Sequence, residues 1–520
     1  MNDSLAAAWR LLPNYLAQHV LLSLCALILG FAISLPLAVA ASRSAAVRWP
    51  SLFIASLIQT IPSLALLALF YPLLLALSAV SVAWFGKGFT ALGFAPSLMA
   101  LTLYSMLPIL RNGVTGILGV DPAAVEAARG MGMTDRQRLT WVELPLAAPV
   151  IMAGVRTAAV WTIGAATLST PVGQTSLGNY IFSGLQTENW VYVLFGCAAS
   201  AVLALAADQL LGLIESGLAH RRPWRVWAGA IGLIVGATAA LSPLVLAAPA
   251  AGGYRIGAKN FSEQYILAEL MAQRLRAAGA GVSLKEDLGS ATAYRALAAG
   301  EIDAYVDYSG TLCANVLGRK DNPGRAAVLR ALTTELRRRD GVVVLGPLGF
   351  ENAYALAMRA DRAKTLQIAG IDDLARHAPT LALGSDLEFL SRPEWSALRG
   401  AYGLTFRKLT SYQPTFMYRA LDDGEADVIS AFSSDGRIAA DHLVVLADPL
   451  HALPPYDAVI LISPKRAGDA RLRAALEPLI GKISVGAMRE ANYSLDRDSD
   501  KQTAAQAARA LAKSAGLAAP

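Results

Sequence analysis

The chain has 520 residues, of which 55% are hydrophobic and 16% are charged. About a quarter of the residues in a typical soluble domain are charged, so this composition excludes a chain that is soluble along its whole length. The formal net charge of +6 is shared between two halves of different character, so it does not indicate nucleic acid as a partner.

Six apolar stretches follow one another in the N-terminal half. Each approaches or exceeds the roughly 20 residues that a helix needs to cross the hydrocarbon core of a membrane. A buried helix of a soluble protein is the alternative for any one of them, but six in succession predict an all-α membrane domain. We place this domain at residues 1–225, and a sixth span with a linker at 226–252. The stretches are residues 16–41, 52–82, 89–110, 145–168, 191–213 and 226–246.

Basic residues are sorted by loop. Arginines follow the first, third and fifth stretches, whereas the loops on the other side hold little beyond Lys87. Because cytoplasmic loops carry the excess of Lys and Arg, the N-terminus and, after six spans, the C-terminal half are predicted to lie outside. The pattern predicts a multi-pass protein of the bacterial cytoplasmic (inner) membrane, in contact with lipid, with its C-terminal domain on the periplasmic or extracellular side.

The sixth stretch has a second interpretation. Its basic start, apolar middle and small-residue end are also typical of a signal peptide that ends in an A-x-A site. A retained span that tethers the C-terminal half and a cleaved linker therefore both stay open.

The loop between the third and fourth stretches is predicted to form two short helices. Asp121 is suited to cap the first helix and Pro122 to occupy its first position. Gly130 and Gly132 are expected to end this helix, and a second amphipathic piece over residues 136–142 leads back to the membrane. An ordinary amphipathic surface loop is the alternative.

The spacing within this loop is more specific than its composition. It resembles the EAA signature of ABC importer permeases, with Val142 where isoleucine is commoner. The resemblance implies that the loop docks into a cleft on a cytoplasmic ATPase subunit. "SLGNYIFSGLQTEN" resembles, more loosely, an external segment of permeases for glycine betaine and other osmoprotectants. The residues that match the EAA signature are Glu126, Ala127, Ala128, Gly132, Leu144 and Pro145.

No stretch of the sequence fits the phosphate-binding pattern G-x-x-x-x-G-K-[ST]. We therefore expect ATP to be hydrolysed by the separate ATPase subunit, with no cofactor bound by this chain and no enzyme activity of its own. Six spans in one chain also suggest that two copies pair as a homodimer to form the pathway.

The C-terminal half, residues 253–520, alternates short apolar strands with helices. This alternation predicts an α/β domain with a parallel sheet and helices on both faces. Ligand sites of such sheets lie at the carboxyl ends of the strands, so we expect "NFSEQ", "DYSGT", "FENAY" and "AFSSDGR" to face a common crevice. The length fits two lobes: the chain leaves the first near Glu351, builds the second through Asp448 and returns through "LPPYDAVILISP". Closure about these crossing strands is expected to trap a ligand.

Four segments resemble the substrate-binding proteins for quaternary amines in osmoprotectant importers: "KNFSEQYILAEL", "GEIDAYVDYSGTL", "LGFENAYALAMR" and "YRALDDGEADVISAFSSDGRI". The resemblance implies a two-lobed periplasmic-binding-protein-like (type II) fold and a ligand such as glycine betaine, choline or carnitine. A trimethylammonium group has no N–H to donate, so aromatic ring faces suit it, each worth roughly 0.5 to 2 kcal/mol.

The resemblance also assigns an aromatic cage and a set of polar contacts. The cage residues are Tyr308, Tyr354, Phe432 and Tyr456, and the family more often has tyrosine in place of Phe432. The candidates for contact with the ligand's anionic or hydroxyl end are Thr311, Gln264, Asn352 and Lys259. Core packing is the alternative for any single ring, and Gln264 and Lys259 are equally suited to start a helix. Asp307 is as well suited to cap a turn or pair with an arginine as to contact a ligand.

Two other functions fit part of the sequence. An importer of amino acids or another small solute would use an arginine for the carboxylate and an acidic residue for the ammonium, and Arg437 with Asp435 supplies both types. A ligand-gated receptor or sensor would share the binding-domain fold but needs no EAA-type loop. An enzyme is disfavoured, because the crevice motifs contain no nucleophile–base pair and no metal-ligand spacing.

Overall fold

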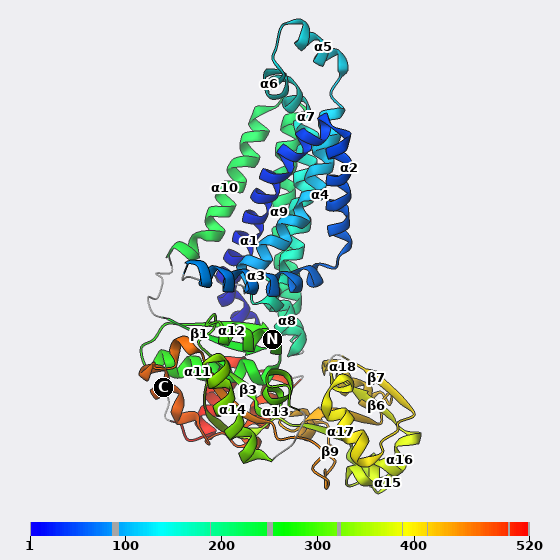
Figure 1. The fold of residues 1–520 in the computed structure, drawn as a ribbon, viewed down its shortest axis with the longest axis vertical. Coiled ribbons are helices and arrows are strands. Elements are labelled where there is room, and N and C mark those ends of the chain that lie inside the picture. The colour runs from blue at the N-terminus through cyan, green and yellow to red at the C-terminus, as the bar shows by residue number, and fades with distance from the viewer. Residues whose placement is uncertain are drawn as a thin grey trace. The chain divides into compact units, whose positions relative to one another are not determined.

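The structure, a computed structural model, describes residues 2–85, 93–187, 189–246, 253–319, 324–386, 388–412, 414–497 and 500–517. Lys87 and the small-residue end of the sixth stretch lie outside the described residues. The chain divides into two compact units (Figure 1). The helical unit holds Ala8–Ile181 and Val193–Pro249, and the C-terminal unit holds Ala250–Pro520 together with Met1–Ala7 and Phe182–Tyr192.

Long apolar helices build the helical unit. Five of the described helices are long and apolar enough to cross a membrane, and α2 with α3 gives a sixth if the pair is one broken span. This agrees with the predicted series of apolar stretches. The helices within residues 2–246 are α1 (Asn2–Arg43), α2 (Ala45–Thr60), α3 (Ser63–Phe85), α4 (Phe94–Leu118), α5 (Pro122–Gly130), α6 (Asp135–Arg138), the π-helix η1 (Leu139–Glu143), α7 (Leu144–Ala166), the 3-10 helix η2 (Thr167–Val172), α8 (Gly178–Gln186), α9 (Trp190–Ala219) and α10 (Pro223–Leu246), and most of α8 belongs to the C-terminal unit.

The second apolar stretch is bent rather than straight. It forms α2 and α3, whose axes differ by 105°. Ile61, which ends α2, has an extended backbone with φ −73° and ψ 127°. The next residue is Pro62. Because a residue that precedes proline avoids the helical conformation, Pro62 accounts for the break between α2 and α3.

Helices α4 and α7 pack closely through glycine. A Cβ atom on Gly154 of α7 would lie 2.7 Å from the Pro108 carbonyl oxygen and 2.7 Å from the Asn112 Cβ on α4. A Cβ on Gly116 of α4 would lie 3.2 Å from the Ala147 carbonyl oxygen on α7. Small residues at such contacts let helix backbones approach in a membrane, where packing replaces the hydrophobic effect.

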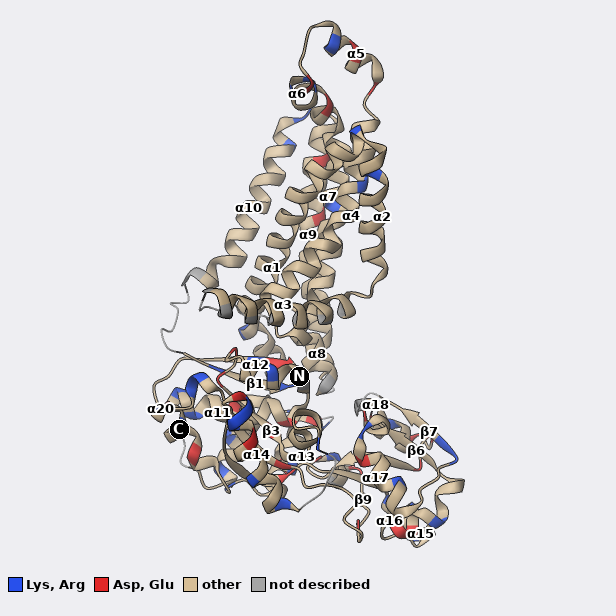
Figure 2. Cartoon of the chain, viewed as in Figure 1, with Lys and Arg blue, Asp and Glu red and all other residues tan. Residues whose placement is uncertain are grey.

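Charged residues gather near one end of the helical unit, and a paired group lies within its described helices. Figure 2 shows basic residues near the end that carries α5 and α6, which agrees with the sorting of arginines by loop. Within the helices, Arg156 of α7 donates from Nε and Nη2 to Asp208 of α9, at 2.5 and 2.7 Å. Its Nη1 donates to Glu215 of α9 at 3.3 Å. Pairing of this kind is what makes charges tolerable in an apolar environment, and here it joins α7 to α9.

The C-terminal unit contains two five-stranded sheets, one in each lobe. The first lobe has strand order β2-β1-β3-β10-β4 and the second has β7-β6-β8-β5-β9. The strands are β1 (Tyr254–Lys259), β2 (Val282–Leu288), β3 (Ala304–Tyr308), β4 (Val343–Glu351), β5 (Tyr354–Arg359), β6 (Ala382–Ser385), β7 (Lys408–Ser411), β8 (Val428–Phe432), β9 (Leu443–Val445) and β10 (Asp457–Ile462). The longer helices are α11 (Ser262–Ala277), α12 (Ser290–Ala298), α14 (Arg325–Asp340), α17 (Pro393–Tyr402), α18 (Pro414–Asp422), α21 (Val485–Asp496) and α22 (Ala504–Ser514).

The sheets are mixed, so the prediction of a parallel sheet is wrong in part. Strands β1, β2 and β3 are parallel, but β10 runs antiparallel to both β3 and β4. In the second lobe β5 runs antiparallel to β8 and β9. The reason is the path of the chain: β4 leads out of the first lobe at Glu351, and the chain re-enters through β10 after Asp448, as the sequence predicted. A strand that enters a sheet from the opposite side must pair antiparallel.

The glycine contact between α4 and α7 gives a test of the helical unit. Gly154→Ala should destabilise it by about 1–3 kcal/mol, because the added methyl group overlaps Pro108 and Asn112. The matched control is Gly164→Ala on the same helix. The added Cβ at this position has no described atom within 4 Å outside its own stretch of helix, and alanine is a better helix former than glycine. The midpoint of thermal aggregation of the detergent-purified chain measures the difference. Equal midpoints for the two variants would contradict the packing described here.

Candidate functional site

A cavity of about 250 Å³ lies in the C-terminal unit and is lined by both lobes and by the segments that connect them. All four motifs predicted to face a crevice contribute to its wall. The lining residues are Lys259, Asn260, Phe261, Ser262, Glu263, Ser290, Tyr308, Thr311, Asn352, Tyr354, Asp386, Glu388, Arg392, Phe432, Ser434, Asp435, Arg437, Tyr456, Asn492 and Asp496.

Strand register brings the four predicted rings to this cavity. Tyr308 and Phe432 are the last residues of β3 and β8. Because β5 is antiparallel to β8, its first residue, Tyr354, pairs with Phe432. In the same way β10 starts opposite the end of β3, with Ala458 paired to Tyr308, so Tyr456 lies just before that pairing. Two strands end and two begin at the same place, and each contributes one ring.

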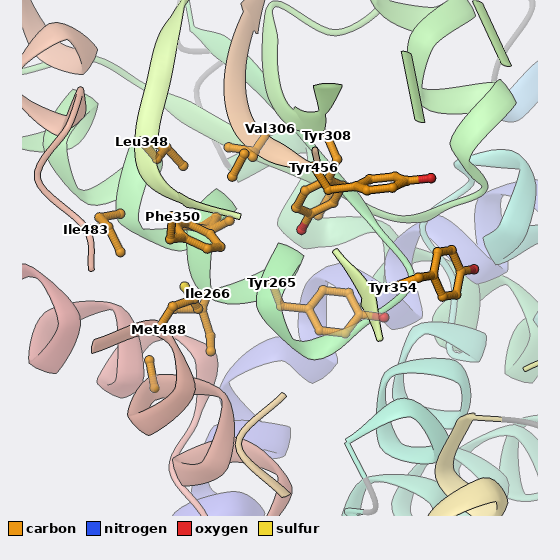
Figure 3. Close-up of a cluster of buried hydrophobic side chains, with 14 of the residues drawn as sticks. Tyr265, Ile266, Val306, Tyr308, Leu348, Phe350, Tyr354, Tyr456, Ile483 and Met488 are labelled. Carbon is orange, nitrogen blue, oxygen red and sulfur yellow. The ribbon is translucent and has the colours of Figure 1, made fainter. Parts of the chain in front are cut away.

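The rings contact one another at aromatic distances. The ring centroid of Tyr354 lies 4.7 Å from that of Phe432 and 6.1 Å from that of Tyr456, the latter edge to face. Figure 3 shows Tyr308, Tyr354 and Tyr456 at one side of a buried apolar cluster that includes Val306 and Phe350. The rings are therefore the border between the core and the cavity.

Close contact with the Tyr456 ring explains why the motif "DYSGT" has a glycine at position 310. A Cβ atom at this position would lie 2.6 Å from the Tyr456 ring. Neighbouring Ser309 joins the same segments, since its hydroxyl donates to the Pro455 carbonyl at 3.0 Å and accepts from the Asp457 N–H at 2.9 Å. The turn after β3 thus holds Tyr456 against the backbone.

Tyr308 is held by the protein as well as exposed to the cavity. Its hydroxyl donates to Glu263 at 2.5 Å and accepts from the Gln264 side-chain amide at 3.0 Å. Its ring stacks on Phe261 with centroids 6.1 Å apart, and the Lys259 ammonium lies 5.2 Å from its centroid. Phe261 is a cavity residue that the sequence analysis did not select.

The structure places some of the predicted polar residues in the cavity lining and others outside it. Thr311 and Asn352 line the cavity. Lys259 lines it too, but its ammonium forms a buried ion pair with Asp307, so Asp307 pairs with a lysine rather than an arginine. Gln264 is not among the described residues that line the cavity, because its amide contacts Tyr308 and the Lys259 N–H.

Arg392 is the main cavity residue that sequence reasoning missed. It donates to Glu394 from Nε and Nη2, at 3.1 and 3.0 Å, and from Nη2 to the Tyr456 hydroxyl at 3.0 Å. Its guanidinium carbon lies 5.2 Å from the Tyr354 ring centroid. Nη1 has a looser contact, 3.5 Å from the exposed Glu388. The only sequence signal was a basic residue before Pro393 in a turn, with acidic residues on both sides.

Three further acidic residues, Glu263, Asp435 and Asp496, line the cavity. Burial raises the pKa of Glu263, although Tyr308, Asn352 and Asn492 all donate hydrogen bonds to it. Burial also raises the pKa of Asp496 to about 6, against the attraction of Arg437. Asp435 is bound to Arg437, with Nη2 to Oδ2 at 3.0 Å, so the pair proposed for an amino-acid ligand is engaged with itself.

The EAA-type loop presents a polar surface at the end of the helical unit. Asp121 caps α5 by accepting from the Ala123 N–H at 2.9 Å, and α5 ends at Gly130, as predicted. Gly132 has φ +78°, which favours glycine. The side chains of Glu126 and Ala127 are exposed, as are Gly132 and Pro145, whereas Ala128 is buried and Leu144 is half-buried.

Comparison with known proteins gives two family matches. Residues 253–514 match the substrate-binding domain of ABC-type glycine betaine transport systems, and residues 30–220 match the binding-protein-dependent transport system inner membrane component.

Individual relatives match one half of the chain or both. The chain is 28% identical over 471 residues to an ergothioneine transport permease and binding protein of Helicobacter pylori, covering 85% of this chain and 80% of the relative. It is 41% identical over 201 residues to a choline transport permease of Bacillus subtilis, covering 39% and 85%. A solved glycine betaine/carnitine/choline ABC transporter structure is 28% identical, with a TM-score of 0.45, and the match covers 50% of this chain and 97% of that one.

The pKa of Asp496 predicts a pH-dependent stability. Between pH 3.8 and about 6 the unfolded chain releases this proton while the folded chain keeps it, so the free energy of unfolding should fall as the pH rises through this window. The fall attributable to Asp496 is at most about 3 kcal/mol. Urea unfolding of the C-terminal unit at several pH values should show a smaller fall in Asp496→Asn. Parallel curves for the two proteins would mean that Asp496 titrates near its ordinary value.

Proposed function

The chain belongs to the binding-protein-dependent ABC importers, as an inner-membrane permease fused to a substrate-binding domain of the glycine betaine type, and from this premise we propose that it captures a quaternary ammonium compound for import. It is a transport component rather than an enzyme. The observation that carries the proposal is the convergence of four rings on one cavity by strand register.

A cation without N–H groups needs ring faces, and these four rings supply them. The edge-to-face contact of Tyr354 and Tyr456 gives the cavity two ring orientations, which suits a roughly spherical trimethylammonium group better than a flat one. The acidic wall formed by Glu263 and Asp496 adds attraction for a cation when these groups are ionised.

Arg392 suits the other end of a zwitterionic ligand. Its Nη1 edge, at 3.5 Å from Glu388, is the part of the guanidinium least engaged by the protein, and guanidinium groups bind carboxylates well. A betaine with a carboxylate would use both ends of the cavity, whereas choline would use one. The relatives are named for ergothioneine and for choline. These names support a quaternary ammonium ligand but do not indicate which group the ligand carries at its other end.

We further propose how capture is coupled to transport. The C-terminal domain, residues 253–520, lies outside and delivers its ligand to the permease of residues 1–225, with residues 226–252 as the connecting span. ATP is hydrolysed by a cytoplasmic ATPase subunit that docks on the loop around Glu126 and Gly132. Two copies of the chain form the pathway. ABC importer permeases work with such an ATPase, and the exposure of the loop supports its use for docking.

The role of the rings can be tested at Tyr354. Tyr354→Leu keeps apolar bulk but removes the ring, so affinity should fall by roughly 3- to 30-fold, the worth of one ring. Tyr354→Phe keeps the ring and should bind within about threefold of the native chain. Calorimetric titration of the purified chain with glycine betaine, choline, carnitine and ergothioneine measures both. If Leu and Phe at this position bind alike, the ring face does not hold the ligand.

The docking role of the loop can be tested separately. Glu126→Lys and Gly132→Trp should each reduce uptake to background in cells, because both alter exposed positions of the loop, while calorimetric affinity stays unchanged. Arg136→Gln, an exposed change in the same loop outside the signature, is the control and should transport normally. Uptake that survives both signature changes would refute the docking role.

The rival with a specific observation in its favour is an amino-acid importer. Arg392 and the acidic wall could hold a carboxylate and an ammonium. Binding of glutamine, arginine or glutamate in place of every methylated amine would favour this rival.

A further inference from the structure

Glu143 is a buried carboxylate at the junction between the EAA-type loop and the membrane helices. It is the last residue of the π-helix η1, which joins α6 to α7, and it is 2% exposed. A π-helical turn is rare and is frequently found at functional sites. Glu143 is no part of the loop signature, so the resemblance gave it no role.

Two arginines from different elements bind this one carboxylate. Arg138, at the end of α6 and itself buried, donates from Nε to Oε1 at 2.9 Å. Arg43, the last residue of α1, donates from Nη2 to Oε2. Each carboxylate oxygen therefore serves one arginine, and Glu143 joins α6, α7 and α1 at a single point.

Arg43 is itself fixed to the turn between α1 and α2. Arg48 of α2 donates to the carbonyl oxygens of Ala41 and Ser42 at the end of α1, at 2.9 and 3.3 Å. A displacement of Glu143 is thus passed to the whole α1–α2 turn.

Helix α5 is held by apolar contacts instead. Val125 of α5 and Leu144 of α7 pack against a cluster formed by Ile117, Val120, Ala147 and Ile151, together with Leu35 and Val39 of α1. Apolar contacts resist separation but slide easily, because they are non-directional. The ionic contacts at Glu143 have fixed geometry and resist sliding as well.

We propose that Glu143 is a positioning residue that makes the loop and the ends of α1 and α7 move as one body when the ATPase subunit displaces the loop. The inference rests on the proposed docking function. Without the carboxylate, Arg43 and Arg138 face each other as like charges, and the loop moves without α1.

The test measures whether the loop and the α1–α2 turn move together. Spin labels at Ala46→Cys and Met131→Cys, both exposed positions, are introduced in the full chain with Cys25, Cys197 and Cys313 replaced by serine. The complex with its copurified ATPase is examined by electron–electron double resonance without nucleotide and with ATP and vanadate. With Glu143 present, the distance distribution should be narrow and the same in both states. In Glu143→Gln, addition of ATP and vanadate should make the distance distribution at least about twofold broader or shift its mean distance.

Controls separate a positioning role from a structural one. Asp135→Asn removes another carboxylate that binds Arg138 but is 89% exposed, and it should behave as the native chain. A merely structural role for Glu143 would lower thermal stability and leave the distances equal in the two states. If Glu143→Gln does not assemble, Arg43→Gln, whose side chain is 41% exposed, breaks the same link to α1 and should give the same broadening.

Equal distributions in the native chain and in the assembled variant overturn the inference. Failure of the proposed docking would appear differently, as the absence of any nucleotide-dependent change in Glu143→Gln and Arg43→Gln together with normal uptake by Glu126→Lys.

Discussion

The antiparallel pairing of β5 with β8 and of β10 with β3 is the constraint on which the candidate ligand site depends. Tyr354 and Tyr456 reach the cavity because β5 and β10 begin where β8 and β3 end. A shift of either strand by one residue would turn its ring to the opposite face of the sheet. The chain passes between the two sheets just before β5 and just before β10, so two of the four rings lie at the points where the lobes are connected.

The sequence predicted the parts that depend on local pattern. Apolar length predicted the membrane helices, and Asp121 with Pro122 predicted the start of α5. Alternating strands and helices predicted an α/β domain, and its length predicted two lobes, with the chain leaving the first lobe near Glu351. Phe432 and the three tyrosines reached the cavity as the family resemblance implied. The bend at Pro62 could have been predicted from the proline itself.

The remaining site residues depend on distant contacts. Arg392 reaches the rings through a turn after β6 whose conformation has no strong sequence signal. Asn492 and Asp496 come from α21, beyond the stretch that carried the resemblance. Gln264 was a candidate for contact with the ligand's anionic or hydroxyl end, but only the structure shows that its amide supports Tyr308. Antiparallel entry of β5 and β10 depends on the path of the whole chain, which alternation alone does not encode.

Charged groups have a common use in the two units: several ion pairs also hold an element or a side chain in place. Arg156 with Asp208 joins α7 to α9, and Glu143 joins the loop to α1. In the C-terminal unit, Lys259 with Asp307 and Arg392 with Glu394 hold side chains next to the rings. Unpaired charges in these places would be costly, so the pairs stabilise specific positions more than they stabilise the fold.

The most direct test of the central claim compares methylated amines with their unmethylated counterparts. Purified chain is titrated calorimetrically with glycine betaine against glycine, and with ergothioneine against 2-thiohistidine. The account predicts that at least one methylated compound binds at micromolar concentration or tighter and that its unmethylated counterpart does not, because only the trimethylammonium group requires ring faces. Equal or tighter binding of the unmethylated compounds would contradict it.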